Sequence, residues 1–156
     1  MSINIRDKGA NGERELATIL NGIITDALTA AGMPLPSKPI VQRNQNQTAV
    51  GGKDLVGTYD IAIEVKRQEQ LSINTWWKQC VASAETLGER PVLIYRQNRM
   101  KWSVVMYGGL LLPGVHGGGA AMMTARVEIS FDDFKIWFRH YVDRKIQNGE
   151  YQYDPR

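Results

Sequence analysis

Asp54, Glu64 and Lys66 are two acids and a base whose types and spacing suit them for chemistry. Residues 55–56 and 61–65 are β-prone runs on either side of a short polar connection, which predicts a β-hairpin. Because side chains alternate between the faces of a strand, Glu64 and Lys66 share one face. If Asp54 lies opposite Glu64, the two like charges destabilise the sheet unless a cation lies between them. We therefore predict that Asp54 and Glu64 hold a divalent metal, with Lys66 beside it.

The register of this hairpin decides whether the two carboxylates meet. A three-residue loop at positions 58–60 places Asp54 opposite Glu64, whereas a two-residue turn sends the two side chains to opposite faces of the hairpin. A three-residue loop usually ends with a residue in the left-handed region, and Asp60 would occupy that place. We therefore expect the three-residue loop.

This set of residues fits the hydrolysis of a phosphodiester. Hard cations such as Mg²⁺ prefer oxygen ligands, and the backbone carbonyl of Val65 is a possible third ligand beside Asp54 and Glu64. A bound metal activates water and offsets negative charge on phosphate, while the Lys66 ammonium can orient the attacking water. The alternative interpretation is structural, because Glu-x-Lys pairs are also frequent on the solvated face of an exposed strand.

The composition indicates one ordinary globular domain. The chain has 156 residues, of which 43% are hydrophobic and 22% are charged, and its net charge of +3 permits an anionic partner. Its one cysteine, Cys80, excludes an internal disulfide and is typical of a reducing cytosol. The sequence contains neither the apolar core of a signal peptide nor an apolar run long enough to cross a bilayer. We therefore expect an intracellular protein that does not contact membranes.

Glu13 belongs to a first helix, which is expected from about residue 11 to residue 31. Apolar residues recur at helical spacing from Leu16 to Leu28, and Glu13 lies at the edge of this stripe. One interpretation of Glu13 is a favourable interaction with the dipole of the helix N-terminus. The other is a third carboxylate directed at the metal site.

The rest of the chain predicts alternating strands and helices. A second helix is expected from Ser72 or Asn74 to Leu87, with Trp77 and not Trp76 on its apolar face. A final helix begins after the capping box at Ser130 and ends before Asn148 and Gly149. Strands are expected at residues 91–95, 101–107 and 126–129, and an extended segment at 39–47.

This order of elements predicts a single α/β domain over residues 1–156, with a central mixed β-sheet flanked by helices. The glycine-rich residues 108–121 follow no phosphate-binding pattern and predict a flap or insert. Residues 150–156 are expected to form a loose tail.

Four blocks of the sequence resemble the archaeal-type Holliday junction resolvases, a branch of the PD-(D/E)XK nuclease superfamily. The blocks are residues 8–16 (KGANGEREL), 41–43 (VQR), 53–57 (KDLVG) and 63–66 (IEVK), in the same order and at similar spacing. Lys53 stands where the superfamily name has a proline. Residues 76–79, part of a compact helix that looks phage-like, and the glycine-rich insert at residues 108–121 fall outside the resemblance.

The resemblance implies a restriction-endonuclease-like domain and a role for each matching residue. It implies that Glu13, Asp54 and Glu64 are acids of the metal site and that Lys66 is the catalytic lysine. It also implies that Arg43 lies near the DNA backbone, whereas the residues alone equally allow a solubilising charge on an edge strand. Gln79 on the second helix either reaches the site, as a glutamine does in some related nucleases, or has a neutral role on the helix surface.

The function expected from these observations is a Mg²⁺-dependent, structure-selective DNA endonuclease, with Mn²⁺ able to replace Mg²⁺. The expected substrate is a four-way junction, cut by a homodimer in the cytoplasm of a bacterium or of a phage-infected host cell. Salt-sensitive phosphate contacts are expected from Arg67, Lys78, Arg96, Arg99 and Lys101. Two alternatives stay open: a nicking, repair or end-processing nuclease of the same superfamily, and a non-catalytic nucleic-acid-binding module.

Overall fold

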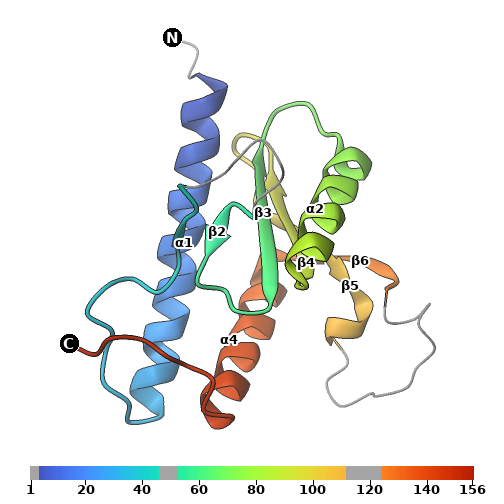
Figure 1. Ribbon diagram of the computed structural model, residues 1–156. Coiled ribbons are helices and arrows are strands. Elements are labelled where there is room, and N and C mark those ends of the chain that lie inside the picture. Colours follow the sequence, from blue (N-terminus) through green and yellow to red (C-terminus); the bar gives the residue numbers. More distant parts are fainter. Residues whose placement is uncertain (1–3, 46–52, 112–123) are drawn as a thin grey trace.

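A computed structural model describes residues 4–45, 53–111 and 124–156 of the chain (Figure 1). The helices are α1 (Ile5–Ala30), α2 (Ile73–Leu87) and α4 (Phe131–Gln147), with a 3₁₀ turn η1 (Gly108–Leu111). The strands are β1 (Gln42–Arg43), β2 (Leu55–Val56), β3 (Ile61–Arg67), β4 (Arg90–Arg96), β5 (Ser103–Tyr107) and β6 (Arg126–Ser130).

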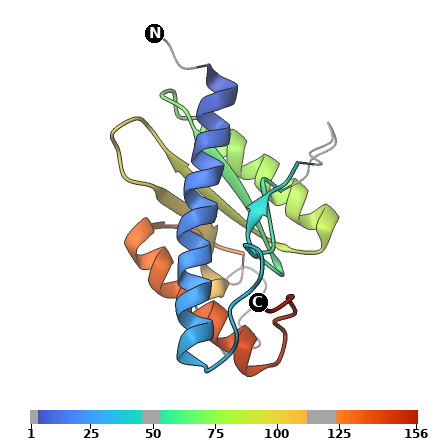
Figure 2. The ribbon, with the colours of Figure 1, turned by 90° about the vertical axis from the view of Figure 1, so that its left-hand side faces the viewer.

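The central sheet is mixed, as the sequence predicts. In the described part of the chain its strand order is β3-β4-β5-β6, with β3 parallel to β4 and the other neighbours antiparallel. The parallel pair is joined through α2, which is the crossover that parallel strands require. Helices flank this sheet (Figures 1 and 2), so the expected α/β class with a central mixed sheet is confirmed.

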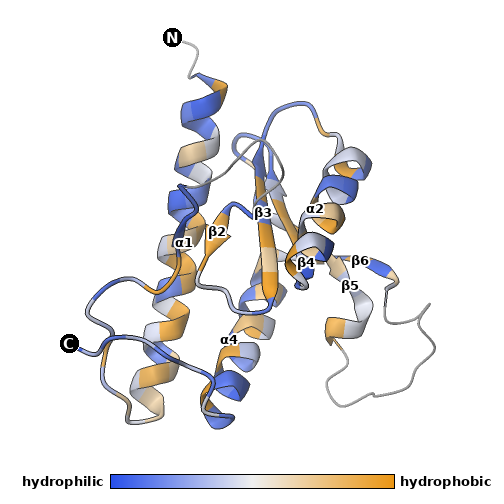
Figure 3. Ribbon diagram, viewed as in Figure 1, coloured by the Kyte–Doolittle hydropathy of each residue, from blue (hydrophilic) through white to orange (hydrophobic). Residues whose placement is uncertain are grey.

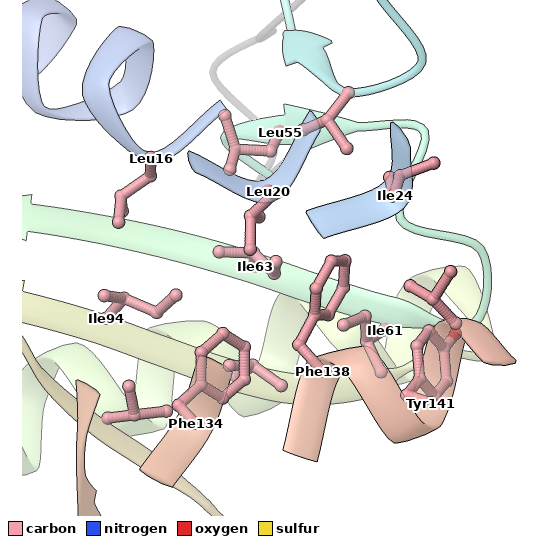
Figure 4. Packing of buried hydrophobic residues seen from close by; sticks show 14 of the residues in the cluster. Leu16, Leu20, Ile24, Leu55, Ile61, Ile63, Ile94, Phe134, Phe138 and Tyr141 are labelled. Atoms are coloured by element: carbon pink, nitrogen blue, oxygen red, sulfur yellow. The ribbon is translucent and has the colours of Figure 1, made fainter. Parts of the chain in front are cut away.

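The two faces of the sheet bury different side chains. Ile61, Ile63 and Val65 of β3 belong to the larger core, which α1 and α4 cover with residues such as Leu20 and Phe138 (Figure 4). The opposite face packs on α2. The alternation along β3 follows the predicted pattern, and it leaves Glu64 and Lys66 on the α2 side of the strand. Hydropathy along the chain reflects this arrangement, since apolar residues concentrate along β3 (Figure 3).

Helix α2 packs on the sheet through both of its tryptophans, of which only Trp77 was expected on the apolar face. Trp76, Cys80 and Ala84 are the buried residues of α2, and Trp76 contacts the ring of Tyr95 at 6.1 Å between ring centroids. Trp77 is only partly buried. Trp77 packs against the same cluster, so only the exclusion of Trp76 is wrong: both lie at helical spacing from Cys80, four and three residues before it. The predicted end of the helix is confirmed, because Gly88 caps it in the left-handed conformation.

Helix α1 begins at Ile5, six residues before the predicted start. The side chain of Asn4 accepts a hydrogen bond from the backbone of Arg6 at 3.1 Å and caps the helix. The prediction missed this first part because the apolar stripe begins only at Leu16. Gly12 lies where α1 crosses the sheet, and a Cβ atom there would come within 3.1 Å of the Trp102 ring.

The predicted hairpin between residues 55–56 and 61–65 is wrong in its pairing. Strand β2 pairs antiparallel with β1, where Leu55 lies opposite Arg43, and the two strands form a small separate sheet in the described part of the chain. Beside β3, the backbone N–H of Asp54 donates to the carbonyl of Ile63 at 3.0 Å. The backbone contact of Asp54 with β3 is therefore made to residue 63, and among the described strands no ladder with residue 64 opposite Asp54 forms.

The connection between β2 and β3 also differs from the predicted loop. Gly57 and Tyr59 have the positive φ angles, 86° and 58°, and Asp60 does not. Gly57 passes so close to the carbonyl of Ile40 that a Cβ atom would lie 1.9 Å from its oxygen. Tyr59 is held in its unusual conformation by packing on Tyr151, with ring centroids 4.5 Å apart. Tertiary contacts thus override the local preference on which the prediction was based.

The C-terminal residues are ordered by contacts with residues 34–40, so the prediction of a loose tail is wrong. The N–H of Ser37 donates to the carbonyl of Asp154, and the N–H of Arg156 donates to the carbonyl of Leu35, both at 2.8 Å. Tyr151 is buried. The tail supplies backbone partners to a proline-containing segment that does not form a longer strand.

The glycine-rich segment is described only in part. Residues 108–111 form η1, whereas residues 112–121, including most of the expected flap, lie outside the described residues. Among the described helices, none combines the length and the apolar character that crossing a membrane requires.

Candidate active site

Asp54 is attached to strand β3 on both sides of position 64. Its backbone N–H donates to the carbonyl of Ile63, and its Oδ2 atom accepts a hydrogen bond from the N–H of Val65 at 2.7 Å. The residue is only 8% exposed. These two contacts fix a buried carboxylate beside Glu64, although the register differs from the predicted one.

Glu64 and Lys66 lie on the same face of β3, and Glu64 Oε1 is 3.8 Å from Lys66 Nζ. The pKa of Glu64 is raised to about 7, mainly by burial and also by the charges of Asp54 and Glu13, against the opposing effect of Lys66. A buried carboxyl with two acids nearby resists ionisation. A cation at this place would remove that resistance, because it favours the charged form of both Asp54 and Glu64.

Glu13 lies close enough to affect Glu64, but its carboxylate is paired with an arginine. Glu13 Oε2 accepts a hydrogen bond from Arg43 Nε at 2.6 Å. Within residues 4–45, 53–111 and 124–156, no group of three or more His, Cys, Asp or Glu side chains is placed to hold a metal ion together. The structure thus brings Asp54 and Glu64 together, and it places Glu13 beside them in an ion pair.

Asn21 sets the position of Arg43, a role that the sequence analysis missed. The side chain of Asn21 accepts from the N–H of Val41 at 2.8 Å and donates to the carbonyl of Val41 at 2.9 Å. This pair of bonds attaches the start of β1 to α1, two residues before Arg43. An asparagine at a partly buried position between the leucine and isoleucine residues of a helix is the sequence signal for such a contact.

The oxygen atoms at this place fit a hard divalent cation. Asp54 and Glu64 supply two carboxylates. In a strand the N–H and C=O of one residue point to the same side, and the N–H of Val65 points at Asp54. The carbonyl of Val65 is therefore directed to the Asp54 side of β3. Two carboxylates and a carbonyl are a usual protein contribution to a Mg²⁺ site.

Two of the predicted DNA contacts, Arg67 and Arg96, are the last residues of the parallel strands β3 and β4. They lie directly opposite each other. Arg96 lies over the ring of Trp102, 4.8 Å from its centroid, and contacts Glu15 at 3.2 Å. Glu15 also accepts a hydrogen bond from the Trp102 indole at 3.2 Å. Glu15 therefore orients Arg96, which the sequence analysis did not anticipate.

The other predicted DNA contacts are at the surface. Arg99 and Lys101 lie in the connection between β4 and β5, where they line a surface cavity of about 600 Å³ together with Arg96. Lys78 and Gln79 are exposed on α2, beside the buried Trp76 and Cys80. The structure leaves Gln79 at the helix surface and brings Arg43 to Glu13.

Comparisons with known proteins give a family and several similar solved structures. The crystal structure of Hjc from Archaeoglobus fulgidus, a Holliday junction resolvase from an archaeal hyperthermophile, is similar with a TM-score of 0.41 and 16% sequence identity. That similarity covers 83% of this chain and 88% of the other. None of the curated proteins compared with this chain matches it.

A family model described as phage putative PDDEXK endonuclease matches residues 4–133. The match includes α1, β2 and β3, and therefore also Glu64 and Lys66. Because it spans most of the 156 residues, this chain belongs to the phage PDDEXK endonuclease family.

Proposed function

We propose that this PDDEXK-type nuclease is a Mg²⁺-dependent, structure-selective DNA endonuclease that cuts four-way junctions as a homodimer. One observation carries the proposal: the carboxylate of Asp54 is fixed by the N–H of Val65 next to Glu64, on the same strand as Lys66. Buried acids are costly to bring together without a charge to compensate them. Their convergence therefore favours an active nuclease over an idle binding module.

In this proposal Asp54, Glu64 and the carbonyl of Val65 hold the Mg²⁺ ion, which Mn²⁺ can replace, and Glu13 completes the acidic set. When bound there, a metal would supply an activated water and compensate negative charge on the phosphate. Asp54 keeps its orientation through the hydrogen bond from Val65. Lys66 places an ammonium beside Glu64, where it orients the attacking water and neutralises charge that develops on the phosphate.

Two of the proposed DNA contacts lie at the ends of the parallel strands β3 and β4. Arg67 follows Lys66 at the end of β3, and Arg96 lies opposite Arg67 on β4. The remaining proposed contacts are Arg43, Lys78, Gln79, Arg99 and Lys101. Because charged contacts to phosphates release counterions, affinity for DNA should fall steeply with salt and depend little on sequence.

A homodimer follows from the proposed substrate. Symmetric cutting of a four-way junction needs two active sites related by a two-fold axis, which an isologous dimer supplies. Equilibrium sedimentation of the protein with and without a junction tests this part of the proposal separately. A monomer on the junction would contradict it.

The main test is cleavage of an end-labelled four-way junction beside a linear duplex of the same sequence. We expect paired, symmetric cuts in the junction with Mg²⁺, and no cleavage with EDTA. Asp54→Asn should abolish cleavage, while Asp26→Asn, which removes a similar charge from the exposed side of α1, should not. Equal cutting of the linear duplex would favour a nicking or end-processing nuclease. Binding without any cleavage would favour the non-catalytic module.

A further inference from the structure

The ion pair between Glu13 and Arg43 joins two residues that the proposed function needs for different ligands. Glu13 is an acid for the metal site, and Arg43 is a contact for a DNA phosphate. In the structure they bind each other, with Arg43 Nε and Glu13 Oε2 2.6 Å apart. While this contact lasts, the Nε of Arg43 and the Oε2 of Glu13 are bound to each other.

The two side chains differ in their access to solvent. The Glu13 side chain is 12% exposed, whereas that of Arg43 is 31% exposed. An incoming phosphate can therefore reach the guanidinium more easily than a hydrated cation can reach Glu13. Arginine binds phosphate through two parallel hydrogen bonds, so a phosphodiester competes well for this side chain.

The backbone around Arg43 ties the ion pair to the rest of the site. Arg43 lies opposite Leu55 in the β1-β2 pair, and the N–H of the following Asn44 donates to the carbonyl of Asp54 at 2.9 Å. Arg43 is thus held between Glu13 on α1 and the strand that carries Asp54. A movement of its side chain away from Glu13 needs no change in these backbone contacts.

The charge of Glu13 matters to the other acids. Glu13 is one of the groups that disfavour ionisation of Glu64. Arg43 partly compensates Glu13 in the free protein, because an ion pair this short and this buried is only weakly screened by water. Without that compensation, Glu13 adds negative charge to the space between Asp54 and Glu64, where a cation would then be held more tightly.

We propose that Arg43 is a gate that couples DNA binding to metal binding: it holds Glu13 in the free protein and releases it when a DNA phosphate takes the guanidinium. This inference rests on the proposed function. Binding of the two ligands is then cooperative, and the coupling is reciprocal by thermodynamic linkage. DNA raises the affinity for the metal, and the metal raises the affinity for DNA by the same factor.

The first experiment measures each ligand alone. Isothermal titration with Mn²⁺ should show that Arg43→Ala binds the metal about fivefold or more tightly than the wild type, because Glu13 is no longer paired. Fluorescence anisotropy with a labelled junction in EDTA should show that Glu13→Gln binds DNA about fivefold or more tightly, because Arg43 is no longer occupied. A loss of structure cannot produce either gain.

The second experiment measures the coupling. In a Lys66→Ala background, which slows cleavage, we expect DNA to increase Mn²⁺ affinity about fivefold or more. Adding Arg43→Ala should remove this increase, and Arg43→Lys should keep part of it because a charge remains. Arg139→Ala breaks an arginine–carboxylate pair on α4, with Asp143 at 3.1 Å, and should change none of these affinities.

The outcomes separate this inference from the proposed function. If Glu13→Gln binds DNA no more tightly than the wild type in EDTA, or DNA leaves Mn²⁺ affinity unchanged, the gate is wrong even if junctions are cut. If the coupling is found but junctions are not cut, the gate stands and the proposed substrate fails. Circular dichroism of each variant checks that its fold is retained.

Discussion

At the scale of single residues, the site is defined by acids that are held close together at an energetic cost. Asp54 is fixed by a backbone hydrogen bond, and Glu64 is partly buried beside it with a pKa raised to about 7. A carboxyl in such surroundings opposes folding once it is ionised. The same arrangement favours a bound cation. The repulsion between the carboxylates therefore both destabilises the metal-free protein and increases its affinity for a metal.

The first prediction concerns the stability of the metal-free protein. The pKa of Glu64 is raised from 4.5 to about 7, so the folded state binds the proton more tightly than the unfolded state. Stability should therefore fall as pH rises from about 5 to 8, by at most about 3 kcal/mol. Glu64→Gln should remove most of this fall. Urea unfolding in EDTA at both pH values measures it, and equal pH dependence in the two proteins would contradict the prediction.

Lys66 gives a second prediction at this scale. Lys66→Ala should lower the cleavage rate by about 100-fold or more while Mn²⁺ affinity stays within a few fold, because the ammonium compensates charge and is not a ligand. Lys66→Arg should restore little, since a planar guanidinium does not replace a compact ammonium. Single-turnover cleavage and metal titration measure the two effects. Full activity of Lys66→Arg would show that any positive charge at position 66 is sufficient for cleavage.

At the scale of elements, Asp60 connects the turn before β3 to β4 and α4. Its carboxylate accepts hydrogen bonds from the Tyr141 hydroxyl and from Arg90, and Lys145 lies at 3.4 Å. Burial alone would raise the pKa of Asp60, but the hydrogen bond from Tyr141 and the charges of Arg90 and Lys145 lower it overall. The carboxylate therefore stabilises the packing of these elements when it is ionised.

Asp60→Asn should therefore destabilise the protein at neutral pH. The folded-state pKa lies below the unfolded value of 3.8, so the stabilisation is present above that pH and disappears as pH falls through the folded-state pKa. We expect a loss of about 0.5–1 kcal/mol at pH 7, because water screens a carboxylate that is nearly half exposed. Thermal unfolding of mutant and wild type at pH 7 and pH 3 measures the difference, which should shrink at pH 3.

The elements that could be predicted from the sequence are those with a local signal. Alternation predicted β3, Gly88 predicted the end of α2, and the capping box at Ser130 predicted the start of α4. The pairing of β2 with β1 had no such signal, because strands of two residues carry no measurable period. The left-handed Tyr59 depends on its contact with Tyr151, which is distant in sequence.

In the candidate site, too, some features have a local sequence signal and others depend on contacts between distant residues. Glu64 and Lys66 could be placed on one face from the period of a strand alone. The proximity of Asp54 was expected through a register that the structure does not have, and it arises instead from the bond to the N–H of Val65. The ion pair of Glu13 with Arg43 joins α1 to β1 across 30 residues, and no pattern within either element indicates it.

At the scale of the whole molecule, the C-terminal tail closes the fold around the small β1-β2 sheet. Tyr151 is buried against Tyr59, and the backbone of Asp154 bonds to Ser37. The tail therefore holds the turn that leads into β3 and the segment that leads into β1. The positions of Glu64 and Lys66 on β3, and of Arg43 on β1, therefore depend on residues from the end of the chain.

Tyr151→Ala should consequently destabilise the whole protein. Removing a buried aromatic ring leaves a cavity, and we expect a loss of about 2–4 kcal/mol in the free energy of unfolding. Gln152→Ala, which changes the exposed neighbour, should have little effect. Urea unfolding followed by tryptophan fluorescence measures both variants. A loss below about 1 kcal/mol for Tyr151→Ala would show that the tail is peripheral to the fold.

The hydrogen bond from Val65 to Asp54 also makes one backbone proton a natural spectroscopic probe. An amide that donates to a carboxylate at 2.7 Å is a charge-assisted donor, so its proton should resonate at an unusually low field. A cation bound by Asp54 would withdraw electron density from the accepting oxygen and move that resonance back towards higher field. A single peak in a ¹⁵N-labelled sample would then report the occupancy of the site, before any bond in DNA is broken.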